Sequence, residues 1–364
     1  MKKFFALVGL IFITLFPVTA AIAAGESGSE ERIWPMDHIQ EIPITEIENI
    51  RIGQAENAGA GTGLTVFISE NGMAAGLDVR GGGPASRESE LLKPLAAAQV
   101  VHAVVLSGGS AFGLGAGNGV MQYLEEHGIG FDVVVTKVPL VVQSDLFDLT
   151  VGDPFIRPDA AMGYEAARRA MEDPNYQDGN HGAGTGATVG KFGGMETCMK
   201  SGIGSYAVRI GDLKIGAVVA VNAIGDIYDW KTGQKTAGLL TPDKTAFRDS
   251  MELMTASTDV VDNRFVENTT LGVIITNASF TKSQLCKIAG MAHDGYARSI
   301  RPVHTTVDGD SIYALSVGEI SADQDLVGAL AAEVMSEAIL RAVLSADSAY
   351  GFPAAKDLEW LNNR

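Results

Sequence analysis

A short polar stretch in the last third of the sequence leads directly into an apolar run. Glu267, Asn268, Thr269 and Thr270 precede the segment 271–276, which has the composition of a buried strand. Strands often begin after polar loops, so the order alone favours an ordinary junction. If the chain is cut between Asn268 and Thr269, however, Thr269 carries a free α-amino group beside its hydroxyl. That amine, with an unperturbed pKa of roughly 7.7–8.0, can serve as the base for the hydroxyl nucleophile.

The cut itself requires only the groups at the junction. The Thr269 hydroxyl would attack the Asn268 carbonyl and form an ester, which water then opens. The preceding segment 241–268 is polar and charged, without a clear core face, as expected of a tether that moves aside after cleavage. The same residues match an Asn-x-Thr glycosylation site, which is the weaker interpretation if the protein is exported by a bacterium.

Residues 1–23 have the layout of a secretory signal peptide. A basic pair at 2–3 precedes an apolar stretch at 4–16, and the small-residue run 18–24 contains the expected cleavage site Ala21-Ile22-Ala23. The apolar stretch is shorter than the roughly 20 residues of a membrane span, which makes an uncleaved anchor the lesser alternative. We therefore expect a secreted or periplasmic protein without a stable membrane anchor.

The composition indicates a globular protein with a sizeable core. The chain has 364 residues and is 46% hydrophobic. Its 44 acidic and 27 basic residues give a net charge of −17, which argues against nucleic acid as a partner. The six histidines show no paired spacing, so neither a metal nor another cofactor is expected. Cys198 and Cys286 are interpreted as small buried hydrophobic residues, although one disulfide is possible.

Two glycine-rich segments resemble nucleotide-binding or hydrolase motifs but fail their tests. In GAGTGATVGK (182–191), Lys191 is followed by Phe192 and not by the Ser or Thr of a phosphate-binding loop. In LSGGSAFGLGAG (106–117), Phe112 stands where a nucleophile elbow needs glycine. Ser110 is therefore interpreted as a turn or helix-capping residue.

The chain alternates short apolar strands with amphipathic helices, which indicates an α/β protein. The expected strands cover 64–69, 101–106, 132–135, 214–222, 271–276 and 311–317, and the expected helices cover 113–127, 158–171, 281–298 and 322–346.

Seven segments occur in an order shared with a known family. They are DVRGGGPASRE (78–88), LSGGSAFGL (106–114), FDLTVGD (147–153), GAGTGATVGK (182–191), VVAVNAIGD (218–226), NTTLGVIITNA (268–278) and RPVHTTVDGDSIYAL (301–315). Together they resemble the P1 (DmpA-like) peptidases, which include the L-aminopeptidase/D-esterase, β-peptidyl aminopeptidases and nylon-oligomer (6-aminohexanoate-oligomer) hydrolases. The resemblance implies a four-layer αββα sandwich similar to that of the N-terminal-nucleophile hydrolases, self-cleavage into two chains, and a homo-oligomer.

The resemblance also assigns roles to residues at the cut. It makes Thr269 the nucleophile and the Asn268-Thr269 bond the site of cleavage. Asn222 matches an asparagine that helps to bind the oxyanion, for which a side-chain amide N–H is a suitable donor. Lys191 matches a lysine that lies near the nucleophile in the nylon-oligomer branch, with a solvated loop lysine as the alternative.

The resemblance extends to a pair of acidic residues, and the chain differs from the family pattern at one position. Asp308 and Asp310 match two acidic residues that hydrogen-bond and orient the nucleophile, although the same spacing occurs in ordinary turns. Phe147 stands where several members have a tyrosine near the substrate carbonyl. No phenolic O–H is available there, so the family's substrate preferences do not transfer in detail.

These observations predict an exported threonine hydrolase that releases N-terminal residues from short peptides or amino-acid amides and esters. The alternatives are an ω-amino-acid oligomer amidase of the same family, acyl transfer of the ornithine acetyltransferase type, and a non-catalytic periplasmic binding protein. The expected layout is a signal peptide at 1–23, an N-terminal extension at 24–60 and a hydrolase domain at 61–364. Self-cleavage would divide that domain into an α chain ending at residue 268 and a β chain at 269–364.

Overall fold

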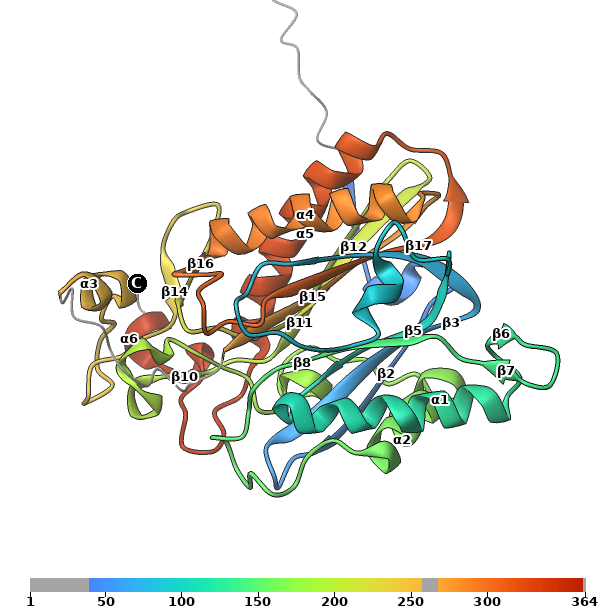
Figure 1. The fold of residues 1–364 in the computed structure, drawn as a ribbon. Helices are drawn as coiled ribbons and strands as arrows, with labels where there is room; N and C mark the ends of the chain where they lie inside the picture. Colours follow the sequence, from blue (N-terminus) through green and yellow to red (C-terminus); the bar gives the residue numbers. More distant parts are fainter. Residues whose placement is uncertain (1–38, 257–267, 363–364) are drawn as a thin grey trace, which may run out of the picture. The chain divides into compact units, whose positions relative to one another are not determined.

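The computed structural model describes residues 39–256 and 268–362 (Figure 1). The expected signal peptide at 1–23 and most of the residues just before Asn268 lie outside the described ranges. The described part of the expected tether includes a short helix, α3 (Ser250–Thr255), which begins at the capping residue Asp249.

Ten strands form one continuous mixed sheet. Its long strand β3 (Thr62–Val79) belongs to both halves: residues 62–68 pair with β2 and residues 74–79 pair with β17. The register of its pairing with β5 shifts between Ile68 and Met73. The first half consists of β1 (Ile39–Ile42), β11 (Ile203–Ile210), β12 (Leu213–Asn222), β15 (Thr269–Ala278) and β17 (Ser311–Ile320); the second consists of β2 (Arg51–Asn57), β5 (Val101–Ser107), β8 (Val141–Asp145) and β4 (Ala85–Arg87).

The two halves of the sheet face each other between two pairs of helices, as Figure 1 shows. One buried apolar cluster joins β12, β15 and β17 to β5 and β8, and therefore lies between the halves. A second cluster packs α4 (Lys282–Ser299) and α5 (Gln324–Ser345) on the first half, and a third packs α1 (Ala116–Glu126) and α2 (Ala160–Glu172) on the second. The expected four-layer αββα arrangement is confirmed.

Local sequence explains where the long elements begin. The Thr281 side chain accepts the Gln284 N–H and the Gln284 side chain binds the Thr281 N–H, so a capping box starts α4. The Asp323 carboxylate caps α5 by accepting the N–H groups of Asp325 and Leu326. β15 is flanked by β12 and β17 and is buried along nearly all its length, which accounts for its apolar sequence.

Smaller elements complete the described chain: β6 (Phe131–Asp132), β7 (Lys137–Val138), β9 (Thr188–Val189), β10 (Met199–Lys200), β13 (Asp226–Tyr228), β14 (Lys235–Ala237), β16 (Ile300–Arg301) and α6 (Glu359–Asn362). The strand expected at 132–135 is wrong, because β6 and β7 form a hairpin whose turn contains Val134 at φ 74°. β1 and β2 fall within the range expected as an N-terminal extension, and both are paired strands of the sheet. Among the described helices, none combines the length and the apolar character needed to span a bilayer.

Candidate active site

Strand pairing brings the residues expected at the site to one end of the first half-sheet. β12 runs antiparallel to β15, and their register places Asn222 opposite Thr269. β15 runs parallel to β17, so the segments that precede the two strands also meet, with Asn268 bridged to Asp308. The last residue of β12, the first residue of β15 and the acidic turn before β17 therefore converge.

The peptide group before Thr269 is held from both sides in the intact chain. The Thr269 hydroxyl lies 2.6 Å from the carbonyl oxygen of Asn268 and donates a hydrogen bond to it. The Gly309 N–H donates to the same oxygen at 2.7 Å, and the Asn268 N–H donates to the Val307 carbonyl at 2.9 Å. A Cβ atom at position 309 would lie 2.6 Å from the Thr269 hydroxyl oxygen, so the site requires glycine there.

Asn222 and Lys191 form a buried pair beside Thr269. The Lys191 ammonium donates to Asn222 Oδ1 at 2.7 Å and to the Asn222 carbonyl at 3.1 Å. Asn222 Nδ2 donates one of its two hydrogens to the Phe147 carbonyl at 2.8 Å; the proposed oxyanion role would fall to the other. Burial lowers the pKa of Lys191 to about 8, against the opposing effect of nearby acidic groups. Lys191 is thus a buried partner of Asn222 and not a solvated loop lysine.

The two aspartates hold the backbone around Thr269. Asp310 Oδ1 accepts the Thr270 N–H at 2.8 Å, which fixes the residue that follows Thr269. Asp308 Oδ2 accepts the N–H and the hydroxyl of Thr305 at 2.7 and 2.6 Å. Burial, with a smaller contribution from Asp310, raises the pKa of Asp308 to about 6. These contacts hold backbone and turn groups, so a direct role of either carboxylate on the Thr269 hydroxyl stays a prediction.

His304 is a member of the site that sequence reasoning missed. Its Nδ1 lies 2.8 Å from Asp310 Oδ2, and its backbone N–H donates to the same oxygen at 3.1 Å. The ring stands edge-on to His293, with centroids 4.8 Å apart, and stacks on Tyr296. A spacing of six residues between His304 and Asp310 follows no regular element, because the contact depends on a left-handed turn with His304 at φ 58°.

A further buried carboxylate, Asp148, anchors the loops behind Asn222. Its oxygens accept the Thr62 hydroxyl and the Gly109 N–H, each at 2.7 Å. Burial raises the pKa of Asp148 to about 6. Asp148 follows Phe147, whose carbonyl binds Asn222, so the Asp148 anchor also fixes that acceptor. Ser110 lies in the adjoining turn, at φ 53°, and donates its N–H to the Leu146 carbonyl.

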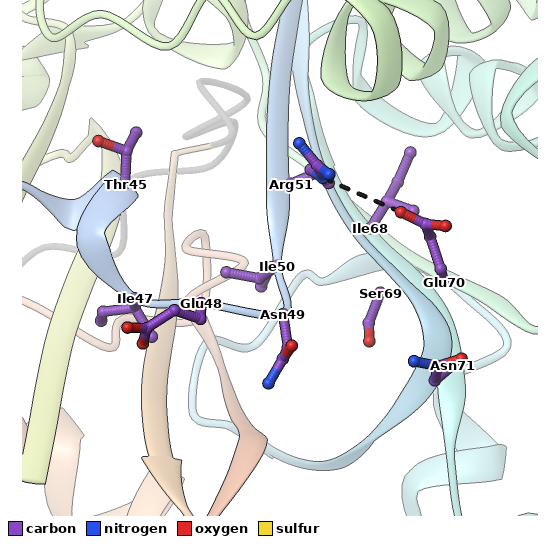
Figure 2. A pocket seen from close by; sticks show the side chains of 10 residues that line it. All are labelled: Thr45, Ile47, Glu48, Asn49, Ile50, Arg51, Ile68, Ser69, Glu70 and Asn71. Carbon is purple, nitrogen blue, oxygen red and sulfur yellow. Dashed lines mark ion pairs between the residues drawn. The ribbon is translucent and has the colours of Figure 1, made fainter.

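Other features of the described chain lie outside this arrangement. Figure 2 shows a cavity of about 340 Å³ lined by residues between 45 and 51 and between 68 and 71, where Arg51 and Glu70 form an ion pair at 4.0 Å. None of the catalytic residues expected from the sequence lines it. Cys198 and Cys286 are free thiols, the first buried and the second partly so. Within 39–256 and 268–362, no group of His, Cys, Asp and Glu side chains is placed to hold a metal ion.

The chain is similar to a known protein family and to characterised and uncharacterised relatives over most of its length. A model of peptidase family S58 matches residues 43–356. An uncharacterized aminopeptidase of Mycobacterium leprae is 36% identical over 340 residues, which cover 85% of this chain and 92% of the relative. The 6-aminohexanoate-oligomer endohydrolase of Paenarthrobacter ureafaciens is 29% identical over 320 residues, which cover 80% of this chain and 83% of the relative.

A solved structure shares the fold. The L-aminopeptidase D-Ala-esterase/amidase of Ochrobactrum anthropi, described as a new variant among the Ntn hydrolase fold, superimposes with a TM-score of 0.61 at 18% sequence identity. The match covers 88% of this chain and 92% of the solved one. The expected likeness to N-terminal-nucleophile hydrolases is therefore confirmed at the level of the fold.

Proposed function

The chain belongs to peptidase family S58, and we propose that it is an exported, self-cleaving aminopeptidase whose nucleophile is Thr269. The observation that carries the proposal is the contact between the Thr269 hydroxyl and the Asn268 carbonyl oxygen at 2.6 Å, with the Gly309 N–H on the same oxygen. The nucleophile, the scissile carbonyl and a donor for the developing negative charge are together before any substrate arrives.

Self-cleavage proceeds in two steps, transfer of the Asn268 acyl group to the Thr269 hydroxyl and hydrolysis of the ester. The Thr269 hydroxyl oxygen bonds to the Asn268 carbonyl carbon and the C–N bond breaks. The Thr269 nitrogen keeps its own hydrogen and takes the hydroxyl proton, so that it becomes a free amine. Water then hydrolyses the resulting ester, which leaves a carboxylate on Asn268 and restores the Thr269 hydroxyl. The Gly309 N–H stabilises the oxyanion in both steps because it already binds that oxygen.

Turnover uses the same hydroxyl with its new amine. The amine takes the hydroxyl proton as the oxygen attacks the substrate carbonyl, and it returns the proton to the leaving amine. An ester on Thr269 remains until water, activated by the same amine, releases the acyl group. The second Nδ2–H of Asn222 and the Gly309 N–H serve as donors to the oxyanion, and Lys191 holds Asn222 in place through Oδ1.

The proposed substrates are short peptides and amino-acid amides or esters with a free N-terminus. Support comes from the aminopeptidase of Mycobacterium leprae, which is 36% identical to this chain. The apolar stretch at 4–16, the basic pair before it and the small residues after it support export through a signal peptide. A homo-oligomer is proposed from the family resemblance.

Paired substrates test this proposal. Amino-acid p-nitroanilides with a free amine are expected to be cleaved, and their N-acetylated counterparts much more slowly, because blocking the amine removes the charge that the site recognises. A chelator is expected to leave both rates unchanged. Equal rates on free and N-blocked substrates would contradict the aminopeptidase assignment and favour internal amide hydrolysis of the 6-aminohexanoate-oligomer kind. Activity lost to a chelator and restored by zinc would exclude the threonine mechanism.

A further inference from the structure

An apolar cavity adjoins the scissile peptide and has no assigned role. Its volume is about 470 Å³, within the roughly 300–1,000 Å³ typical of ligand pockets. Its wall is formed by Phe192, by Ile224, by Met251 and Met254 of the helix α3, and by the turn 302–307. Lys191 precedes Phe192 and donates its N–H to the Ile224 carbonyl at 2.9 Å, so the segments that carry the catalytic groups also form the cavity.

The cavity lies on the acyl side of the nucleophile. Val307, one of its lining residues, accepts the Asn268 N–H at 2.9 Å. Thr269 attacks the Asn268 carbonyl in self-cleavage and the substrate carbonyl in turnover. With one nucleophile and one set of oxyanion donors, the two carbonyls must occupy nearly the same place. The acyl residue of a substrate therefore replaces Asn268, next to Val307 and the cavity.

The lining defines the chemistry of the occupant. Among the described residues that line the cavity there is no carboxylate, ammonium or guanidinium group, and most side chains are apolar. His304 is the only titratable side chain among these lining residues, so a charged substrate side chain would lose its hydration there for at most one imidazole partner. Met251 and Met254 of α3 supply flexible thioether side chains, which adapt to occupants of different shape.

The methionine-bearing wall is firmly anchored. Asp226 accepts the N–H and the hydroxyl of Ser250, the first residue of α3, each at 2.9 Å. The Lys235 ammonium lies 2.7 Å from the same carboxylate. The position of α3 is therefore fixed by a buried ionic contact, and the cavity is a preformed feature of the described chain.

We propose that this cavity is the specificity pocket for an apolar side chain, such as that of leucine, methionine or phenylalanine, on the residue transferred to Thr269. The inference rests on the proposed function. It names the substrate class as peptides and amides with an apolar N-terminal residue. A linear methylene chain shares this chemistry, so the test includes both forms of apolar acyl group.

The experiment compares kcat/KM for leucyl, alanyl and 6-aminohexanoyl p-nitroanilides in cleaved enzyme. The wild type is expected to prefer leucyl over alanyl at least about tenfold, since a single methylene in an apolar pocket is worth about 10–200-fold. Met254→Trp, which fills the cavity, is expected to lower the leucyl rate much more than the alanyl rate and so to abolish that preference. Met254→Ala is a milder variant and should lower the preference severalfold. Met171→Ala removes a partly buried methionine of α2 against another core cluster and serves as the matched control.

The outcomes separate the pocket from the function on which it rests. An unchanged leucyl-to-alanyl ratio in self-cleaved Met254→Trp would overturn the pocket, even though cleavage and alanyl turnover show that the function stands. If 6-aminohexanoyl is the better wild-type substrate and its rate is the one that the variant loses, the apolar pocket stands and its occupant is the linear chain. Absence of self-cleavage and of all turnover in the wild type would instead remove the proposed function, and the pocket with it.

Discussion

Thr269 and Asn222 meet across two antiparallel strands, and each depends on neighbours that hold it by direct contacts. Lys191 and the Thr188 N–H both donate to Asn222 Oδ1, which turns the amide nitrogen toward the Phe147 carbonyl. The Phe147 carbonyl therefore helps to fix the direction of the Asn222 amide. The Asn222 amide nitrogen is thus a donor of fixed direction, which is what the proposed oxyanion role requires.

Replacing Asn222 tests that reading at the residue scale. Asn222→Ala is expected to lower kcat by about 10²–10³-fold with little change in KM, because an oxyanion donor acts mainly in the transition state. Asn277→Ala is the matched control, since Asn277 is a partly buried asparagine near the other end of β15 that binds the Asp212 carbonyl. Steady-state kinetics on self-cleaved protein provides the measurement. An unchanged kcat for Asn222→Ala would remove Asn222 from the site.

At the scale of elements, the turn before β17 does as much for the site as the strands. Its Gly309 N–H binds the Asn268 carbonyl, Asp308 accepts hydrogen bonds from Thr305 within the turn, and Asp310 accepts the Thr270 N–H. Tyr296 of α4 donates its hydroxyl to the Thr270 carbonyl at 3.2 Å. Both polar groups of the Thr270 peptide are thus held, one by the turn and one by the helix, which fixes the direction of Thr269.

Gly309→Ala is expected to slow self-cleavage by at least about tenfold. The added methyl group would stand 2.6 Å from the Thr269 hydroxyl oxygen, so one of the two must move by several tenths of an ångström to reach ordinary contact. A misplacement of about 1 Å can cost about 10²-fold in rate. Gly115→Ala is the control, since a Cβ there meets nothing within 4 Å. The fraction of uncut chain on a denaturing gel against time measures the effect. Cleavage of Gly309→Ala at the wild-type rate would contradict the geometry.

His304 is expected to act as a positioning residue through Asp310. His304→Ala removes the Nδ1 contact with Asp310 and should lower both self-cleavage and kcat about tenfold, with KM nearly unchanged. His304→Asn should recover most of the loss, because asparagine offers an N–H near the same place and tolerates a positive φ. A purely structural role would give equal losses in both variants. Self-cleavage of His304→Ala and His304→Asn, followed against time on a denaturing gel, distinguishes recovery from equal loss.

The same elements show what the sequence could predict. β15 and α4 follow from an apolar run and a capping box, which are local signals. β8 escaped prediction because Gln143, Ser144 and Asp145 are polar yet buried in the sheet, so its sequence lacks a strand pattern. Thr269, Asn222 and Lys191 were identified by resemblance, and the structure brings them together. The contact between His304 and Asp310 had no sequence signal, since a left-handed residue creates it.

At the scale of the whole molecule, several ionisable side chains are buried, among them Asp148 and Lys191. Burial raises the pKa of Asp148 from 3.8 to about 6. A raised pKa means that the folded state favours the protonated form. The stabilising effect of that proton is complete below the unfolded pKa and is lost as the pH rises through about 6. The Asp148 carboxylate therefore opposes folding at neutral pH, although it anchors the loops behind the site.

Asp148→Asn is expected to flatten the pH dependence of stability. From the shift in pKa, Asp148 should contribute roughly 1.4 kcal/mol more to the free energy of unfolding at pH 5 than at pH 8. Denaturant unfolding of the uncut Thr269→Ala chain, with and without Asp148→Asn, measures this difference in a single continuous chain. The change in the free energy of unfolding caused by Asp148→Asn should therefore be more unfavourable at pH 5 than at pH 8. An identical pH slope in both chains would contradict the assigned role.

The central claim is that Thr269 cleaves its own chain and then serves as the nucleophile. Intact mass spectrometry of active, purified protein tests it most directly. We expect two fragments, one that begins near Ala24 and ends at Asn268, and one that begins at Thr269. Thr269→Ala should give a single uncut mass without activity, whereas Thr270→Ala, which keeps the N–H that binds Asp310, should still be cut. A single uncut mass from fully active wild-type protein would contradict the account.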